Sequence, residues 1–154
     1  MKKLLIAVLV IAGMSLALAS SSLRLVSGVG YGLVGIEYEY GLPHQNLAYS
    51  GGLGLVASDT TTGLSVVGGT TFYLDQSQDR GGLYMSLRVA TAFLTIKDYS
   101  ATAVMGIVSG GYRFASDRFD VGLEFGFGVA TATAAGVSES GVFPALGLSI
   151  GFRP

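Results

Sequence analysis

The stretch Phe119-Asp-Val-Gly-Leu-Glu-Phe-Gly-Phe-Gly-Val-Ala130 decides the fold, because its side chains alternate strictly between two kinds. The odd-numbered positions from Phe119 to Val129 are all large and apolar, and the even-numbered positions carry glycine, alanine or an acid. Successive side chains of a β-strand point to opposite faces, whereas a helix would mix both kinds on every side. The pattern therefore predicts a strand with one large apolar face and one small or acidic face.

The same alternation recurs along the rest of the chain. It predicts six further strands, at 34–41, 46–55, 64–74, 83–93, 104–114 and 142–152. An even-numbered antiparallel barrel needs an eighth strand, and residues 23–30 supply it. A two-residue hairpin at Tyr31 and Gly32 would then pair Val29 with Val34 and place both outside. One long bent strand through this region is the alternative.

Composition narrows the class of protein further. The chain has 154 residues, which suits one domain, with 50% apolar and only 12% charged residues, 24 glycines and no cysteine. High hydrophobicity with little charge excludes a disordered chain, and the lack of cysteine excludes disulfides and thiolate metal sites. The formal net charge of −1 does not favour binding to nucleic acid.

The first residues are typical of a Sec signal peptide. Lys2 and Lys3 precede an apolar run, and Ala17-Leu-Ala19 is a cleavage site of the small-x-small type. We expect residues 1–19 to be removed and residues 20–154 to form the barrel domain, with an N-terminal transmembrane anchor as the alternative. Removal of Lys2 and Lys3 leaves seven basic and ten acidic residues, a net charge of −3.

Two kinds of barrel fit the alternation. A soluble, lipocalin-like barrel turns its apolar face inward and needs a charged exterior, whereas a membrane barrel turns that face to lipid. The chain has too little charge to coat a soluble barrel, and its other face is mostly glycine, alanine, serine and threonine, which suits the narrow lumen of eight strands. We therefore predict an all-β, eight-stranded, antiparallel, up-and-down transmembrane β-barrel.

The chain resembles the small outer-membrane β-barrels of the OmpA/OmpX-like and opacity-protein group. The resemblance covers the mature chain as a pattern, and its most specific part is the last strand, where Gly147, Ile150 and Phe152 match the family's assembly signal. It implies an outer-membrane location, contact with membrane lipid, and insertion by the barrel-assembly machinery. We expect a monomer with no nucleic-acid partner.

Charged side chains on the small face are the candidate functional residues. By the alternation, three bases and four acids point into the lumen: Arg24, Glu37, Glu39, Arg88, Arg113, Asp120 and Glu124. Buried charges need partners, so we expect an ion-pair network that fills the lumen. A gate or narrow path for ions is the alternative, because ionisable residues inside a membrane are candidates for function.

No residue pattern points to catalysis, a cofactor or a metal site, and we expect no enzyme. The single histidine, His44, is expected in a solvated turn, and the tyrosines other than Tyr84 are candidates for an interfacial girdle. Outer loops are predicted at 31–32, 58–62, 97–101 and 133–140, all too short to favour adhesion. Three functions follow: a structural envelope barrel, a narrow channel for ions or small solutes, and a secreted soluble barrel with an apolar ligand.

Overall fold

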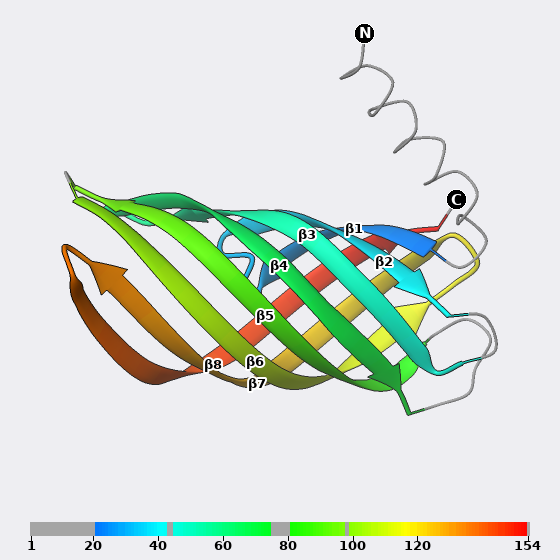
Figure 1. The fold of residues 1–154 in the computed structure, drawn as a ribbon. Coiled ribbons are helices and arrows are strands. Elements are labelled where there is room, and N and C mark those ends of the chain that lie inside the picture. The colour runs from blue at the N-terminus through cyan, green and yellow to red at the C-terminus, as the bar shows by residue number, and fades with distance from the viewer. Residues whose placement is uncertain (1–20, 43–44, 75–80, 98, 154) are drawn as a thin grey trace, which may run out of the picture.

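The computed structural model describes residues 21–42, 45–74, 81–97 and 99–153, and it is a closed antiparallel barrel of eight strands (Figure 1). The strands are β1 (Ser21–Gly28), β2 (Val34–Gly41), β3 (Leu47–Ala57), β4 (Thr61–Tyr73), β5 (Gly82–Ile96), β6 (Tyr99–Ala115), β7 (Phe119–Ala134) and β8 (Val137–Phe152). Each strand pairs with its neighbours in the chain, and β1 pairs with β8. The predicted all-β, eight-stranded antiparallel barrel is confirmed. The predicted signal peptide and His44 lie outside the described residues.

The barrel closes with a stagger of ten residues. The row of paired residues that starts at Leu23 reaches Val142 after crossing Tyr38, Gly51, Gly68, Val89, Gly106 and Val129. Leu23 itself pairs with Phe152, ten residues further along β8. With about 3.3 Å per residue and about 4.8 Å between strands, this stagger tilts the strands by roughly 40° from the barrel axis.

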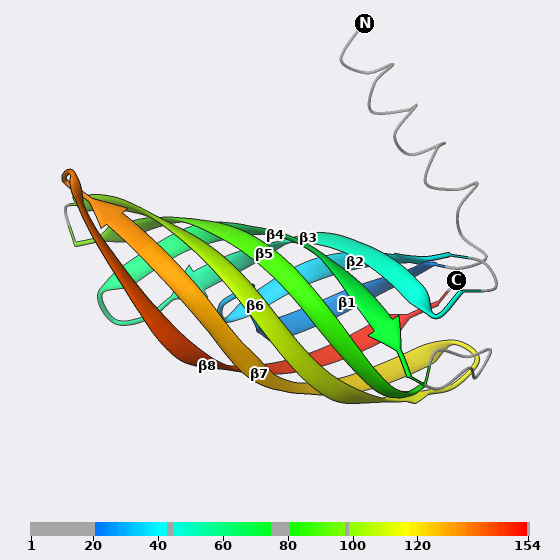
Figure 2. The same cartoon turned by 60° about the horizontal axis from the view of Figure 1, so that its bottom comes forward.

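The two ends of the barrel differ in shape (Figures 1 and 2). At the end that holds Ser21 and Phe152, called here the terminal end, the strands finish at a similar level. At the other end, the extended end, β5 to β8 continue well past β1 and β2, which have only eight residues each. The wall is therefore low on one side, where residues 29–33 connect β1 to β2.

The β1–β2 connection differs from the predicted two-residue hairpin. The last pair of this hairpin is Val26 with Gly35, and residues 29–33 form a longer turn that folds into the barrel. Val29 and Tyr31 are buried inside, not exposed outside. The turn is possible because Gly28, Gly30 and Gly32 adopt positive φ, as does Val29 at 41°. The alternative of one long bent strand is also wrong, since β1 and β2 pair antiparallel.

The strands at the extended end are longer than predicted. Residues 133–140 were expected to form a loop, yet only Ala135 and Gly136 separate β7 from β8, both with positive φ as in a tight hairpin turn. The expected loops at 58–62 and 97–101 are shortened in the same way by β4 and β6. In these segments serine and threonine replace the large apolar residues on the outer face, so the pairing continues without an apolar alternation.

The exterior of the barrel is apolar. Leu25, Leu53, Leu87, Val108 and Phe125 are each more than half exposed, and they belong to five different strands. The interior holds glycine, small residues and buried charges, so the alternation read from the sequence assigns the faces correctly for most strands. Among the described residues there is no helix with the length and hydropathy needed to span a membrane.

Candidate functional site: the charged lumen

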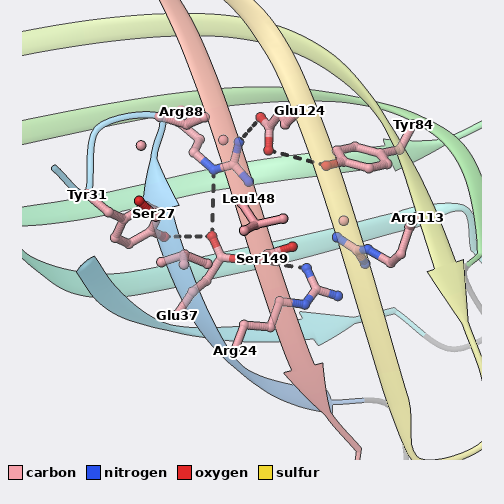
Figure 3. A pocket seen from close by; sticks show the side chains of 15 residues that line it. Arg24, Ser27, Tyr31, Glu37, Tyr84, Arg88, Arg113, Glu124, Leu148 and Ser149 are labelled. Carbon is pink, nitrogen blue, oxygen red and sulfur yellow. Dashed lines mark hydrogen bonds and ion pairs between the residues drawn. The ribbon is translucent and has the colours of Figure 1, made fainter. Parts of the chain in front are cut away.

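The seven predicted charges all lie in the lumen, in the half of the barrel nearer the terminal end. They come from β1, β2, β5, β6 and β7, and their side chains are almost completely buried: Arg24, Glu37, Glu39, Arg88, Arg113, Asp120 and Glu124. Because β-strands direct alternate residues inward, strands that are distant in the sequence deliver these groups to one place. Figure 3 shows most of this set around the remaining space in the lumen.

Glu39 is the centre of the network. Its carboxylate accepts two hydrogen bonds from Arg24, at 2.7 and 2.8 Å from Nη1 and Nη2. Arg113 Nη1 donates a third at 3.1 Å, and the Tyr73 hydroxyl donates a fourth at 2.8 Å. Forked pairing between guanidinium and carboxylate is among the stronger hydrogen-bonding arrangements in proteins. Glu39 thereby joins β1, β2, β4 and β6 through one side chain.

Glu124 forms the second centre, closer to the middle of the barrel. It pairs with Arg88 Nη1 and accepts hydrogen bonds from the hydroxyls of Ser86, at 2.7 Å, and Ser109. Arg88 Nε also lies 3.6 Å from one carboxylate oxygen of Glu37, and Arg24 Nη1 lies 3.5 Å from the other. Glu37 therefore connects the Glu124 group to Arg24. All seven charges therefore belong to one continuous network.

Asp120 brings in a base that the sequence reading missed. Its carboxylate is fully buried and lies 3.4 Å from Arg24 Nε, 3.8 Å from Arg113 Nε and 3.5 Å from Arg153 Nε. Arg153 follows β8, and its main-chain N–H donates to the Arg118 carbonyl, which directs its side chain to the mouth of the lumen. With Arg153 the network has four bases and four acids, so its formal charge is balanced. The alternation could not reveal this, because Arg153 stands beyond the last strand.

Three tyrosines complete the network. Tyr84 points inward as predicted, but Tyr31 and Tyr73 are also buried inside and are not girdle residues. The Tyr31 hydroxyl donates to Glu37 at 2.6 Å, and Arg113 lies over the rings of Tyr73 and Tyr84, 5.0 Å from each centroid. Tyr31 was misassigned because it lies in the inward-folded turn, and Tyr73 because its strand alternates less regularly.

Glycines make room for these aromatic rings. A Cβ on Gly35 would lie 2.8 Å from Tyr31 Cδ1, and one on Gly52 would lie 2.9 Å from Tyr31 Cε1. These glycines are inward-facing positions on β2 and β3, where a larger residue would push the ring out of its place. These inward-facing glycines therefore reflect the size of the side chains that the lumen must hold.

Apolar side chains fill the lumen on the extended side of the network. Val26, Tyr31, Val67 and Ala90 form one cluster, and Val29, Ile107 and Ala145 form a second, with Met105 packed against both.

A cavity of about 10 Å³, enough for about one water molecule, remains among the charges. No group of three or more acidic, histidine or cysteine residues in the described part of the chain could hold a metal ion. The site binds its charges to one another.

The predicted assembly-signal residues lie on β8 near the terminal end. Phe152 points outward and its ring contacts that of Phe119, with centroids 6.1 Å apart. Ile150 pairs with Leu25 on one side and Val121 on the other, and Gly147 leaves space that Val29 occupies. Their role in assembly stays a prediction.

Comparison of the chain with models of known protein families, with curated proteins and with solved structures gives no match.

Proposed function

We propose that this chain is a non-catalytic, integral outer-membrane β-barrel with a structural role in the cell envelope. The observation that carries the proposal is an apolar exterior of membrane thickness around a lumen closed by paired charges. Along β7 the outward side chains from Phe119 to Val129 are apolar and largely exposed. Ten residue steps of about 3.3 Å at a tilt of roughly 40° rise about 25 Å, the height of the apolar band of outer-membrane barrels.

The exposed apolar side chains on the outside of the barrel form a band, called here the apolar band. Different kinds of residue mark its two limits. At the terminal end it finishes in exposed aromatic rings, including Tyr49, Tyr112 and Phe114, with Tyr112 and Phe114 in edge contact at 4.7 Å. At the extended end, just beyond Val129, hydroxyl pairs begin: Thr131 with Ser140 at 2.9 Å and Thr133 with Ser138 at 2.8 Å. The exposed rings at the terminal end suit the aromatic girdle of a membrane barrel, and the hydroxyl pairs mark where the large apolar side chains of β7 and β8 end.

The two other candidate functions are less well supported. A soluble barrel for an apolar ligand needs a polar exterior and an apolar cavity, whereas this exterior is apolar and the lumen is charged. A channel needs a continuous path, and the charged part of the lumen holds a cavity of only about 10 Å³. The outer membrane in particular is inferred from the predicted signal peptide and from the resemblance of the last strand to an assembly signal.

Detergent and heat test the proposal together. The mature chain, residues 20–154, should fold only with detergent micelles or lipid vesicles, because a closed barrel with an apolar exterior is insoluble in water. It should then migrate on a gel as a compact species without boiling and as the full-size chain after boiling. A mature chain that folds and stays in the aqueous phase without detergent would contradict the proposal.

A further inference from the structure

On the low side of the barrel, β1 ends at Gly28 and β2 begins at Val34. The wall is therefore incomplete over part of the apolar band. β1 stops opposite Gly147, while the apolar outer face of β8 continues to Val142. This distance is on the order of 10 Å along the barrel axis. If the band lies in hydrocarbon, as proposed above, the interior at this level opens sideways to lipid tails.

The floor of this opening is the inward-folded turn itself. Gly30 reaches the opposite wall, since a Cβ there would lie 3.1 Å from Ala90 Cβ and 3.2 Å from Ile107 Cδ1. The turn therefore crosses the lumen and separates the charged network from the part nearer the extended end. Tyr31, which closes the network at this level, belongs to the same turn.

The inner face above the floor is apolar and small. The inward residues that follow on β5, β6 and β8 are Ala92, Met105, Ala103 and Phe143. Met105 and Phe143 are only partly buried, although they point inward. Among the described residues, the first charge met on this inner face beyond the floor is Glu139, near the tip of β8. The side chains of β5, β6 and β8 at this level therefore favour an apolar occupant.

Two features reduce the number of unpaired backbone polar groups on the free edge of β8 at this level. Residues 137–146 of β8 pair only with β7, so their other edge faces the low side. Pro144 has no N–H to present there, and the Leu146 carbonyl already accepts the N–H of Val29. An unpaired edge in hydrocarbon is costly, and both features reduce that cost for an apolar neighbour.

A groove on the outer face ends near the same place. It crosses β6, β7 and β8 and ends at Ser27 and Gly28, below the turn. Its outward-facing lining includes Gly110, Leu123, Phe125, Leu146 and Leu148. Apart from Ser27 and Glu124, the groove is lined by apolar residues and glycine, which suits an acyl chain.

We propose that one acyl chain of a membrane lipid enters the barrel over residues 29–33 and lies against Met105 and Phe143. The inference rests on the proposed membrane location. A second copy of the chain is a poorer occupant, because two barrels inserted in the same orientation would cross their tilted β8 edges at a steep angle and could not pair them.

The chain lacks tryptophan and cysteine, so a single tryptophan reports on one position. Phe143→Trp, Phe127→Trp and Tyr84→Trp are each folded into phosphatidylcholine vesicles with or without bromine on the acyl chains, and folding is checked by heat-dependent migration. Phe127 points outward opposite Pro144, and Tyr84 is buried in the charged network. Met105→Trp is the second test position if Phe143→Trp does not fold.

Phe143→Trp should lose about half of its emission to brominated lipid, close to the loss at Phe127→Trp, because the bromines lie in the hydrocarbon core. Tyr84→Trp should keep its emission. If Phe127→Trp is quenched but neither inward test position is, the lateral entry is wrong and the membrane location stands. If aqueous acrylamide quenches Phe143→Trp and brominated lipid does not, the space holds water and the inference is likewise overturned. No quenching at Phe127→Trp would contradict the membrane location itself.

Discussion

At the residue scale, each large polar side chain in the lumen is accommodated by glycines on neighbouring strands. Tyr31 is held over Gly35 and Gly52, and its hydroxyl bonds Glu37. The charges could be predicted from the alternation, since a charge on the small face has to be inside. Their partners could not, because pairing depends on the register between strands, which the sequence of one strand does not contain.

Two glycines that differ in the space around them give a matched test of crowding in the lumen. A Cβ on Gly54 would meet the Tyr31 carbonyl and come within 2.6 Å of Ser65 Oγ, whereas one on Gly106 would meet nothing within 4 Å. Gly54→Ala should therefore lower the free energy of unfolding by about 1–3 kcal/mol, as overpacking does. Gly106→Ala should change it by less than about 0.5 kcal/mol or raise it slightly. Urea unfolding in vesicles measures both, and equal effects would show that lumen crowding is not limiting.

Glu39 should be the most sensitive of the acids, because Arg24, Arg113 and Tyr73 all depend on it. Glu39→Gln keeps the size of the side chain and removes the charge, which leaves buried guanidinium groups without compensation. We expect a loss of about 3–5 kcal/mol in the free energy of unfolding. Asp117→Asn, in the exposed turn between β6 and β7, is the control and should stay within about 0.5 kcal/mol. A Glu39→Gln variant as stable as that control would refute the network's role.

At the element scale, the alternation predicts the parts of the strands whose outer face is apolar. It does not predict the parts that extend beyond the apolar band. β7 is predicted correctly from Phe119 to Ala132, but Thr133 and Ala134 are expected in a loop, because threonine replaces the large apolar residue on the outer face. The same reason explains the longer β6 and β8. The β1–β2 turn was misread for another reason: its length is set by contacts with the opposite wall, through Gly30, and not by local turn chemistry.

Two positions on β6 test the limit of the apolar band. Val108 and Thr102 are both β-branched, outward-facing and exposed, and Val108 lies within the band while Thr102 lies beyond it. Val108→Arg should cost about 2–4 kcal/mol in vesicles, and Thr102→Arg about 0–1 kcal/mol. Folding yield and urea midpoints in vesicles give the comparison. A similar cost at both positions would place the limit of the band elsewhere.

At the scale of the whole molecule, the barrel combines a closed charged half with an apolar half that is open on one side. The number of strands, the closure of the barrel and the character of its two faces can be predicted from the sequence, because periodicity and composition depend only on the order and type of the residues. The unequal height of the wall cannot, since it results from eight-residue strands beside strands of up to 17 residues under a stagger of ten. Any function beyond architecture is expected where these two halves meet, at residues 29–33.

The closed half predicts that the protein does not conduct. With room for about one water among the charges, an ion would have to separate Arg88 from Glu124 or Arg24 from Glu39 to pass. The folded barrel should therefore give no regular current steps in a planar lipid bilayer. Arg88→Ala removes one side of the Glu124 pair and serves as the sensitive variant, with Asp117→Asn outside the lumen as its control. Regular steps in the unmodified protein that change in Arg88→Ala but not in Asp117→Asn would show that the lumen is an ion path and that its charges line it instead of closing it.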